Sequence, residues 1–379
     1  MGLLPSPTDY PRERLFSLDL LRGIDMFYLA VVSDGLAEAF RALGLDPAWE
    51  RFFCTHPWSG FTLYDFIMSL FIFMCGAAIP FSLGRRLVDG KPGPGYWRHV
   101  LSRVALLWFL GMLAQGGLAT FDLHRISFYS NTLQAIAVGY LVAACVITIR
   151  PWKVRVLVPV LLAAAYGLLL HVGGDYSKDG SLAQVVELKI LHAVLPADSA
   201  QTAYIVKYGC AWHLPSLMFS VITLAGCFAT EILRRRDWSE GRRAGLLGAC
   251  GLATLAVGWA LVGAGVPMIK NIWTASFSLQ AIGWAVLSLA ALYVLTDILK
   301  FRRGTGLLLL FGQFALTAYV CETIFGETCF TAGDRLFSGL RRFFDPKWTE
   351  TIRCIGYGLV VIAVVTIRRQ LTLRGCKRG

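Results

Sequence analysis

Charged side chains stand inside apolar segments of this chain, where each costs a few kcal/mol and needs a partner or a function. The first such segment reads SLDLLRGIDMF, in which Asp19, Arg22 and Asp25 follow one another at intervals of three residues. This spacing places all three along one face of a helix. They form either an ion-pair network that fixes helix packing or a site in which Arg22 meets a phosphate and an aspartate orients it.

A second cluster, CTHPWSGFTLYDFIMSLFIF, combines a histidine with a carboxylate. His56 stands just before an apolar run, and Asp65 lies about one turn inside that run. A histidine can act as a base or a nucleophile near neutral pH, and a buried carboxylate can fix its tautomer. A loop histidine more often has no chemical role, but this pairing predicts a site at His56 and Asp65, with Trp58 in its wall.

Three further polar segments approach the same predicted side of the membrane, and they read GCAWHLPS, MIKNIWTASF and LLLFGQFALTAYVCE. Gln134 adds an amide within another apolar run. Together these residues predict a polar cavity. The alternative explanation is that aromatic residues mark the membrane interface and that buried amides join helices.

The elements that must position these residues are membrane-spanning helices. Of the 379 residues, 56% are hydrophobic and 16% are charged, whereas a soluble domain carries about 25% charged residues. The mean hydropathy is +0.59. The apolar runs show no period-two alternation and reach the ~20 residues that a spanning helix needs. We therefore predict an all-α polytopic membrane protein with about ten transmembrane helices, in a single domain over residues 1–379.

The predicted spans share this length and composition, and they are Leu18–Phe40, Phe61–Leu83, Val100–Leu118, Asn131–Ile149, Val156–Val172, Leu214–Leu233, Ala244–Val262, Thr274–Thr296, Gly306–Phe325 and Ile352–Ile367.

The net charge of +12 does not indicate a nucleic-acid partner, because the Lys and Arg residues cluster in alternate loops. This bias fits the positive-inside rule. It predicts a cytoplasmic N-terminal segment (1–17) and a cytoplasmic C-terminal tail (368–379). The basic loop 326–351 is an exception, and its RLFSGLRRFF stretch is explained as a short interfacial helix. The ten cysteines show no zinc-ligand spacing, so no metal is predicted.

Five segments follow one another in the order of a known family, and they read RLFSLDLLRGIDMF, HPWSGFTLYDFIMSLFIFMCGAAIPFS, LQAIAVGY, KNIWTASFSLQAIGW and FGQFALTAYV. The chain resembles the heparan-alpha-glucosaminide N-acetyltransferase family, and its bacterial members most closely. The resemblance runs from about Arg14 to Tyr319. Its most specific parts are the His–Trp–Gly–Asp segment and the Lys–Asn–x–Trp–Thr–x–Ser–Phe segment.

The resemblance implies a multi-span acetyltransferase of the cell inner membrane. Such an enzyme takes acetyl-CoA, its co-substrate, from the cytoplasm and passes the acetyl group to an amino sugar or glycan on the far side. We predict no metal cofactor, and a homodimer is one option for the assembly. The family's active-site histidine falls on His56 and the following acid on Asp65. Whether the histidine is acetylated or acts only as a base stays open.

In this layout the CoA phosphates would lie near the cytoplasmic arginines, and Asn271, Ser276 or Lys270 would polarise the acetyl carbonyl. The residues expected to bind substrate or acetyl-CoA are Asp19, Arg22, Asp25, Trp58, Gln134, Lys270, Asn271, Trp273 and Ser276.

The chain departs from the family pattern at three places. Ser69 stands where proline is usual, Trp212–His213 replace an acidic, glycine-containing motif, and Phe314 replaces an asparagine. The departures at Trp212–His213 and Phe314 concern which acceptor the enzyme would use. The alternatives are O-acetylation of a surface glycan, a secondary transporter that uses the intramembrane charges as an ion path, and a structural membrane subunit.

Overall fold

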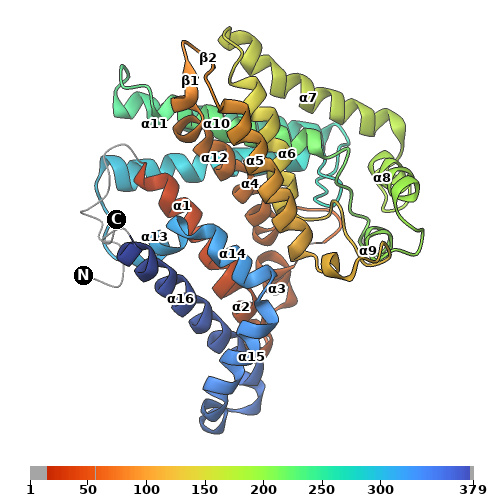
Figure 1. Cartoon of the computed structure of the whole chain (residues 1–379), viewed down its shortest axis with the longest axis vertical. Helices are drawn as coiled ribbons and strands as arrows, with labels where there is room; N and C mark the ends of the chain where they lie inside the picture. Colours follow the sequence, from red (N-terminus) through yellow and green to blue (C-terminus); the bar gives the residue numbers. More distant parts are fainter. Residues whose placement is uncertain (1–14, 56, 376–379) are drawn as a thin grey trace. The chain divides into compact units, whose positions relative to one another are not determined.

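The computed structural model describes residues 15–55 and 57–375, and helices make up nearly all of its regular structure (Figure 1). Within these ranges the strands are β1 (Leu87–Val88) and β2 (Lys91–Pro92), which pair as an antiparallel hairpin. The two-residue turn between them places Asp89 and Gly90 at φ values of 51° and 72°. Such tight hairpin turns require positive φ at these positions. The predicted all-α class is confirmed.

The chain forms two compact units. Unit 1 combines the N-terminal segment up to Pro57, residues Thr62–Ile67 and the C-terminal segment from Ser288. Unit 2 combines Trp58–Phe61 with Met68–Leu287. The chain passes between the units within the helices α4 (Leu63–Ser82) and α12 (Ala275–Leu292) as well as in the loop before α4. No linker composition in the sequence therefore marks the boundary.

Unit 1 contains two helical regions from opposite ends of the chain. Its N-terminal helices are α1 (Phe16–Phe27), the π-helical turn η1 (Tyr28–Val32), α2 (Ser33–Leu43) and α3 (Pro47–Cys54). Its C-terminal helices are η4 (Tyr293–Ile298), α13 (Gly306–Gln313), α14 (Ala315–Thr323), α15 (Gly326–Phe337), η5 (Ser338–Phe343), η6 (Pro346–Trp348) and α16 (Thr349–Gly375).

Glycines allow the helices of unit 1 to approach closely. A Cβ atom on Gly23 of α1 would lie 1.8 Å from the carbonyl oxygen of Leu308 in α13. A Cβ atom on Gly312 of α13 would lie 1.9 Å from the carbonyl oxygen of Asp19. No side chain fits at either position, so α1 and α13 pack backbone against backbone, as small residues permit in membranes.

Unit 2 is a helical bundle. Its helices are α5 (Tyr96–Ala114), α6 (Thr132–Val146), α7 (Trp152–Gly173), α8 (Leu182–Val194), α9 (Ala200–Tyr208), α10 (Ser216–Leu233) and α11 (Glu240–Gly263), with the short turns η2 (Gly84–Arg86) and η3 (Leu118–Thr120). Two of these helices, α8 and α9, lie in the long connection between α7 and α10. Ile79, Tyr96, Tyr140 and Leu224 are almost completely buried in one apolar cluster. This cluster joins α4, α5, α6 and α10.

Six helices in the described part of the chain are long and apolar enough to cross a membrane, and they are Leu63–Arg86, Trp152–Gly173, Ser216–Leu233, Glu240–Gly263, Ala275–Ile298 and Pro346–Arg374. The helices α13 and α14 together would be a seventh, but the chain bends by 77° between them. The prediction of about ten spans is therefore wrong for the residues that the structure describes. These apolar helices support a multi-pass membrane protein.

The three remaining predicted spans do not qualify, and each has an identifiable physical reason. Leu18–Phe40 is interrupted by the π-helical turn η1 and carries the charges of the α1 cluster. The helix α5 has Arg98, His99 and Arg103 in its first half. The helix α6 has 15 residues, which span only about 22 Å at 1.5 Å per residue. The hydrocarbon layer is about 30 Å thick.

Candidate functional site

The first cluster of predicted site residues lies on α1. Arg22 Nη1 donates to Asp19 Oδ1 at 3.1 Å, so the two form an ion pair one helical turn apart. Asp25 is 1% exposed, and within the described residues neither of its carboxylate oxygens has a hydrogen-bond partner. A buried carboxylate without a partner is costly. The helix therefore carries one acid that is paired and one that is open to a proton, an ion or a ligand group.

Sequence reasoning missed the residue that caps this helix, Asp297 in η4. Its carboxylate accepts hydrogen bonds from the backbone N–H of Phe16 at 3.3 Å and of Ser17 at 2.9 Å. Arg302 lies 3.7 Å from the same carboxylate and 4.3 Å from the ring centroid of Phe16. A negative charge at a helix N-terminus is stabilising. The cap is 280 positions from Ser17, so no local pattern indicates it.

Asp65 lies in the first turn of α4 and is 1% exposed. The hydroxyl of Thr62 lies 2.8 Å from Asp65 Oδ2 and accepts the backbone N–H of Asp65 at 3.1 Å. The same hydroxyl lies 3.2 Å from the carbonyl oxygen of Thr55. These contacts fix the carboxylate at the start of the helix. His56 lies outside the described residues, so its predicted pairing with Asp65 stays a prediction.

Two of the sequence segments that carry the family resemblance meet in unit 2. The backbone N–H of Gly60 donates to the carbonyl oxygen of Met268 at 2.8 Å. The ring centroids of Phe61 and Phe277 lie 5.5 Å apart. The segment after the predicted histidine and the segment around Lys270 therefore form one local structure, although about 200 residues separate them.

Asn271 and Trp58 tie this structure to two other loops of unit 2. The side-chain Nδ2 of Asn271 donates to the carbonyl oxygen of Tyr208 at 2.6 Å, and the backbone carbonyl oxygen of Asn271 accepts the N–H of Ala211 at 3.0 Å. Trp58 Nε1 donates to the carbonyl oxygen of Tyr176 at 3.1 Å. Both predicted binding residues thus hold backbone segments in place.

Trp273 and Ser276 lie in a turn whose backbone is constrained. Trp273 is 3% exposed and adopts a φ of 48°, which is rare for a bulky residue and is found at functional sites more often than elsewhere. The hydroxyls of Thr274 and Ser276 both donate to the carbonyl oxygen of Pro267 at 2.8 Å. Lys270 stands half-buried at the start of this turn.

The side-chain amide of Gln134 bonds to the backbone at the start of α6. Its Oε1 accepts the backbone N–H groups of Ser130 at 3.0 Å and Asn131 at 3.1 Å, and its Nε2 donates to the carbonyl oxygen of Phe128 at 2.5 Å. With Asn131 it forms a capping box at the start of α6. Sequence reasoning expected it to bind substrate, whereas the structure shows its amide bonded to the backbone.

Sequence reasoning also missed Glu187 of α8, which is 0% exposed. Its Oε2 accepts the backbone N–H groups of Trp212 and His213, both at 2.9 Å, and lies 3.0 Å from His213 Nδ1. The ring of Tyr129 stands edge-on to His213 at 5.2 Å, and its hydroxyl lies 2.7 Å from Ser216 Oγ. Glu187 lies in the run VVELKILHAVL, and its partner His213 is 26 positions away, so no local pattern pairs the two.

Two cysteines near the predicted site segments are not thiolates at neutral pH. Burial raises the pKa of the Cys54 thiol and of the Cys210 thiol to about 11. Lys270 lowers the pKa of Cys210, but less than burial raises it. Neither thiol is therefore activated as a nucleophile. Among the described residues, no group of three or more His, Cys, Asp and Glu side chains could hold a metal ion.

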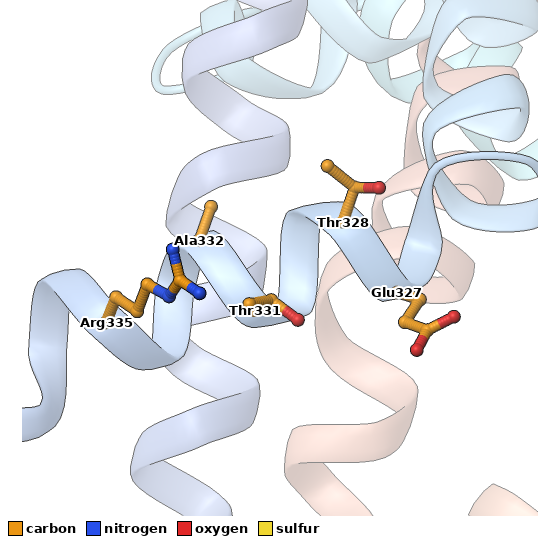
Figure 2. A pocket seen from close by; sticks show the side chains of 5 residues that line it. All are labelled: Glu327, Thr328, Thr331, Ala332 and Arg335. Carbon is orange, nitrogen blue, oxygen red and sulfur yellow. The ribbon is translucent and has the colours of Figure 1, made fainter.

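A hollow of about 390 Å³ lies on α15 (Figure 2). Its lining residues are Glu327, Thr328, Thr331, Ala332 and Arg335. All of them belong to one face of α15, and Glu327 and Arg335 lie at the two ends of the hollow (Figure 2). None of the predicted site residues lines this hollow, and the polar clusters described above lie elsewhere in the chain.

The apolar helices and the buried polar clusters define the class as a multi-pass helical membrane protein. A comparison with models of known protein families and with curated proteins finds no match. The family resemblance therefore rests on the sequence segments themselves.

Proposed function

We propose that the chain is a transmembrane acetyltransferase. It moves an acetyl group from cytoplasmic acetyl-CoA to an amino sugar or glycan on the other side of the membrane. One observation carries this proposal, namely the contact of Gly60 with Met268 and of Phe61 with Phe277. These contacts join the two segments that are most specific to the family resemblance.

The proposed chemistry uses His56 either as the group that takes the acetyl or as the base that removes a proton from the acceptor. Asp65, which is buried and held by Thr62, supplies the carboxylate for this histidine. Substrate and acetyl-CoA are bound by Asp19, Arg22 and Asp25, and by Trp58, Lys270, Asn271, Trp273 and Ser276. Gln134 supports the site by starting α6.

The proposed location is the inner membrane, with both termini in the cytoplasm. Acetyl-CoA is made in the cytoplasm, and its phosphates suit the basic clusters that follow the apolar helices. Arg85, Arg86 and Arg103 belong to these clusters. Positive-inside topology explains the same arginines, so they are weaker support than the contact between the motif segments.

The test is the release of CoA from acetyl-CoA by the purified protein in nanodiscs. We expect release that rises with glucosamine and falls on the order of 10²-fold or more in His56→Ala and Asp65→Asn, as loss of an acid–base group causes. His192→Ala is the matched control, because this exposed histidine lies on α8. A panel of amines and alcohols with labelled acetyl-CoA separates N-acetylation from O-acetylation. No release by the folded protein with any acceptor would refute the proposal.

A secondary transporter is the second candidate, and the buried carboxylate of Asp25 favours it. If the Leu18–Phe40 segment crosses the membrane, Asp25 is an intramembrane acid, and such acids without a fixed partner serve proton or sodium pathways in transporters. For a transporter we expect ion-dependent uptake of amino sugars into proteoliposomes without CoA release, and its loss in Asp25→Asn. Uptake that depends on neither the ion gradient nor Asp25 would exclude this candidate.

A further inference from the structure

The pair formed by Glu187 and His213 has the geometry of a carboxylate that orients an imidazole. Glu187 Oε2 already accepts two backbone N–H groups, so the third contact, with His213 Nδ1 at 3.0 Å, is best satisfied by an N–H donor. This leaves the lone pair of the imidazole on Nε2. The side chain of His213 is 31% exposed while that of Glu187 is 0% exposed. The buried acid therefore fixes a histidine whose other nitrogen can meet a ligand.

Three buried polar atoms, one in this pair and two in residues near it along the chain, lack a hydrogen-bond partner within the described residues. They are Oε1 of Glu187, Oε1 of Gln184 and the indole Nε1 of Trp212. Gln184 lies one turn before Glu187 on α8, and Trp212 precedes His213 in the chain. Buried polar groups are almost always paired. Two acceptors and one donor match a ligand that carries both N–H or O–H donors and hydroxyl acceptors.

An aromatic ring stands beside the imidazole of His213 and the indole of Trp212. The ring centroid of Tyr129 lies 5.2 Å from that of His213 and 6.0 Å from that of Trp212. The backbone carbonyl of Tyr129 accepts from Gln201 Nε2 at 2.8 Å, which holds this segment in place. Aromatic faces with a few convergent polar groups are typical of small-molecule sites. A sugar with free hydroxyl or amino groups combines the two properties.

We propose that Glu187 and His213 form the proton-accepting site for the acceptor substrate, an amine or hydroxyl group of a sugar. This inference rests on the proposed acetyl transfer, and it assigns to His213, in place of His56, the role of the base that takes the acceptor's proton. The acceptor nitrogen or oxygen forms a bond to the acetyl carbon, and the C–S bond of acetyl-CoA breaks. His213 Nε2 takes the acceptor's proton and returns it to the CoA thiolate, so the products are the acetylated sugar and CoA thiol. Glu187 is a positioning residue that acts through His213.

The experiment measures transfer of labelled acetyl from acetyl-CoA to glucosamine by the full chain in nanodiscs. We expect His213→Ala to transfer on the order of 10²–10⁴-fold more slowly, the loss typical of a missing general base. Added imidazole restores part of the rate, whereas pyrazole, which has the same shape but is a weaker base, does not. The control is His192→Ala, because His192 is an exposed histidine on the same helix as Glu187. We expect this variant to behave as wild type.

The role of Glu187 has a separate readout in the nitrogen NMR signals of histidine. We expect His213 to carry its proton on Nδ1 in the wild type and to lose this preference in Glu187→Gln. If His213 keeps its proton on Nδ1 in Glu187→Gln, the positioning role of Glu187 is refuted. If His213→Ala does not fold, His213→Gln replaces it, because glutamine keeps a donor toward Glu187 but is not a base.

Two outcomes separate this inference from the proposed function. If the wild type transfers acetyl and folded His213→Ala or His213→Gln does so at the same rate, the inference fails and the acetyltransferase stands. If the wild type releases no CoA with any acceptor, the proposed function fails and the inference fails with it.

Discussion

At the scale of single residues, the polar side chains inside apolar segments divide according to their partners. Gln134 and Ser276 are bonded to backbone carbonyl and N–H groups. Asp25 and Glu187 instead keep carboxylate oxygens that have no partner among the described residues. A polar group that is bonded to the backbone is held in place, whereas one that lacks a partner is ready for a ligand, an ion or a proton. The carboxylate of Asp25 favours the transporter alternative, and Oε1 of Glu187 supports the acceptor site proposed at His213.

The structural role of Gln134 gives a testable prediction. Gln134→Ala leaves two backbone N–H groups and one carbonyl without partners, so we expect a loss of about 1–3 kcal/mol in stability. Gln134→Glu keeps the acceptor for both N–H groups and should lose less. The measurement is thermal unfolding in detergent. Wild-type stability in Gln134→Ala together with a raised KM for the acceptor would assign this residue to substrate binding instead.

The sequence shows a residue's partner only when the partner is near in the chain. The pair of Asp19 and Arg22 could be predicted, because residues three apart on a helix are neighbours. Asp297 could not be found, since the helix that it caps begins 281 positions earlier. Glu187 could not be paired with His213 because two loops and α9 lie between them. The position of His56 is not described, so its role remains predicted.

At the scale of helices, close crossings in unit 2 depend on glycine. A Cβ atom on Gly76 of α4 would lie 1.9 Å from the carbonyl oxygen of Thr223 in α10. A Cβ atom on Gly226 of α10 would lie 2.0 Å from the carbonyl oxygen of Phe73. The obstacle in both cases is backbone, which cannot move aside as a side chain can. These glycines therefore set the distance between the two helices.

Gly76→Ala should destabilise the protein by about 1–3 kcal/mol, because overpacking forces the helices apart. Gly248→Ala in α11 is the matched control, since a Cβ atom there meets nothing within 4 Å. The control should gain up to about 1 kcal/mol, because alanine favours a helix over glycine. Thermal unfolding of both variants measures the difference. Equal melting temperatures would show that α4 and α10 do not cross as described.

Hydropathy predicts helices more reliably than it predicts which helices cross a membrane. Six of the ten predicted spans match helices that qualify, because their apolar runs are long and carry few charges. The others fail through features that a smoothed hydropathy profile hides. These features are the π-helical turn η1, the arginines of α5, the length of α6 and the 77° bend between α13 and α14.

At the scale of the whole molecule, the six qualifying helices allow a topology in which most basic clusters share one side of the membrane. If the chain returns through α5 and α6 to the side on which α5 begins, the loops after Arg85, Arg150, Arg234 and Lys300 lie on that side. We propose from the positive-inside rule that this side is the cytoplasm. Both termini then lie on the opposite side, unless the Leu18–Phe40 segment and the bent pair α13–α14 also cross.

The proposed cytoplasmic termini therefore require that these two segments cross the membrane. We expect a fluorescent protein fused after Arg374 to fluoresce, because Arg368, Arg369 and Arg374 favour the cytoplasm. Alkaline phosphatase at the same position should be inactive. Fusions after Gly304, which both proposed topologies place in the cytoplasm, are the control. An active phosphatase at the C-terminal position would show that the bent pair returns to its starting side.

The cap that Asp297 provides for α1 also sets an order of events during synthesis. The acceptor of the Ser17 N–H leaves the ribosome 280 residues after its donor. At about 5–20 residues per second this delay is roughly 14–56 s. Through that interval the first N–H groups of α1 lack this acceptor. Any factor that binds the start of α1 in place of Asp297 would therefore have to stay until residue 297 of the 379 has been made.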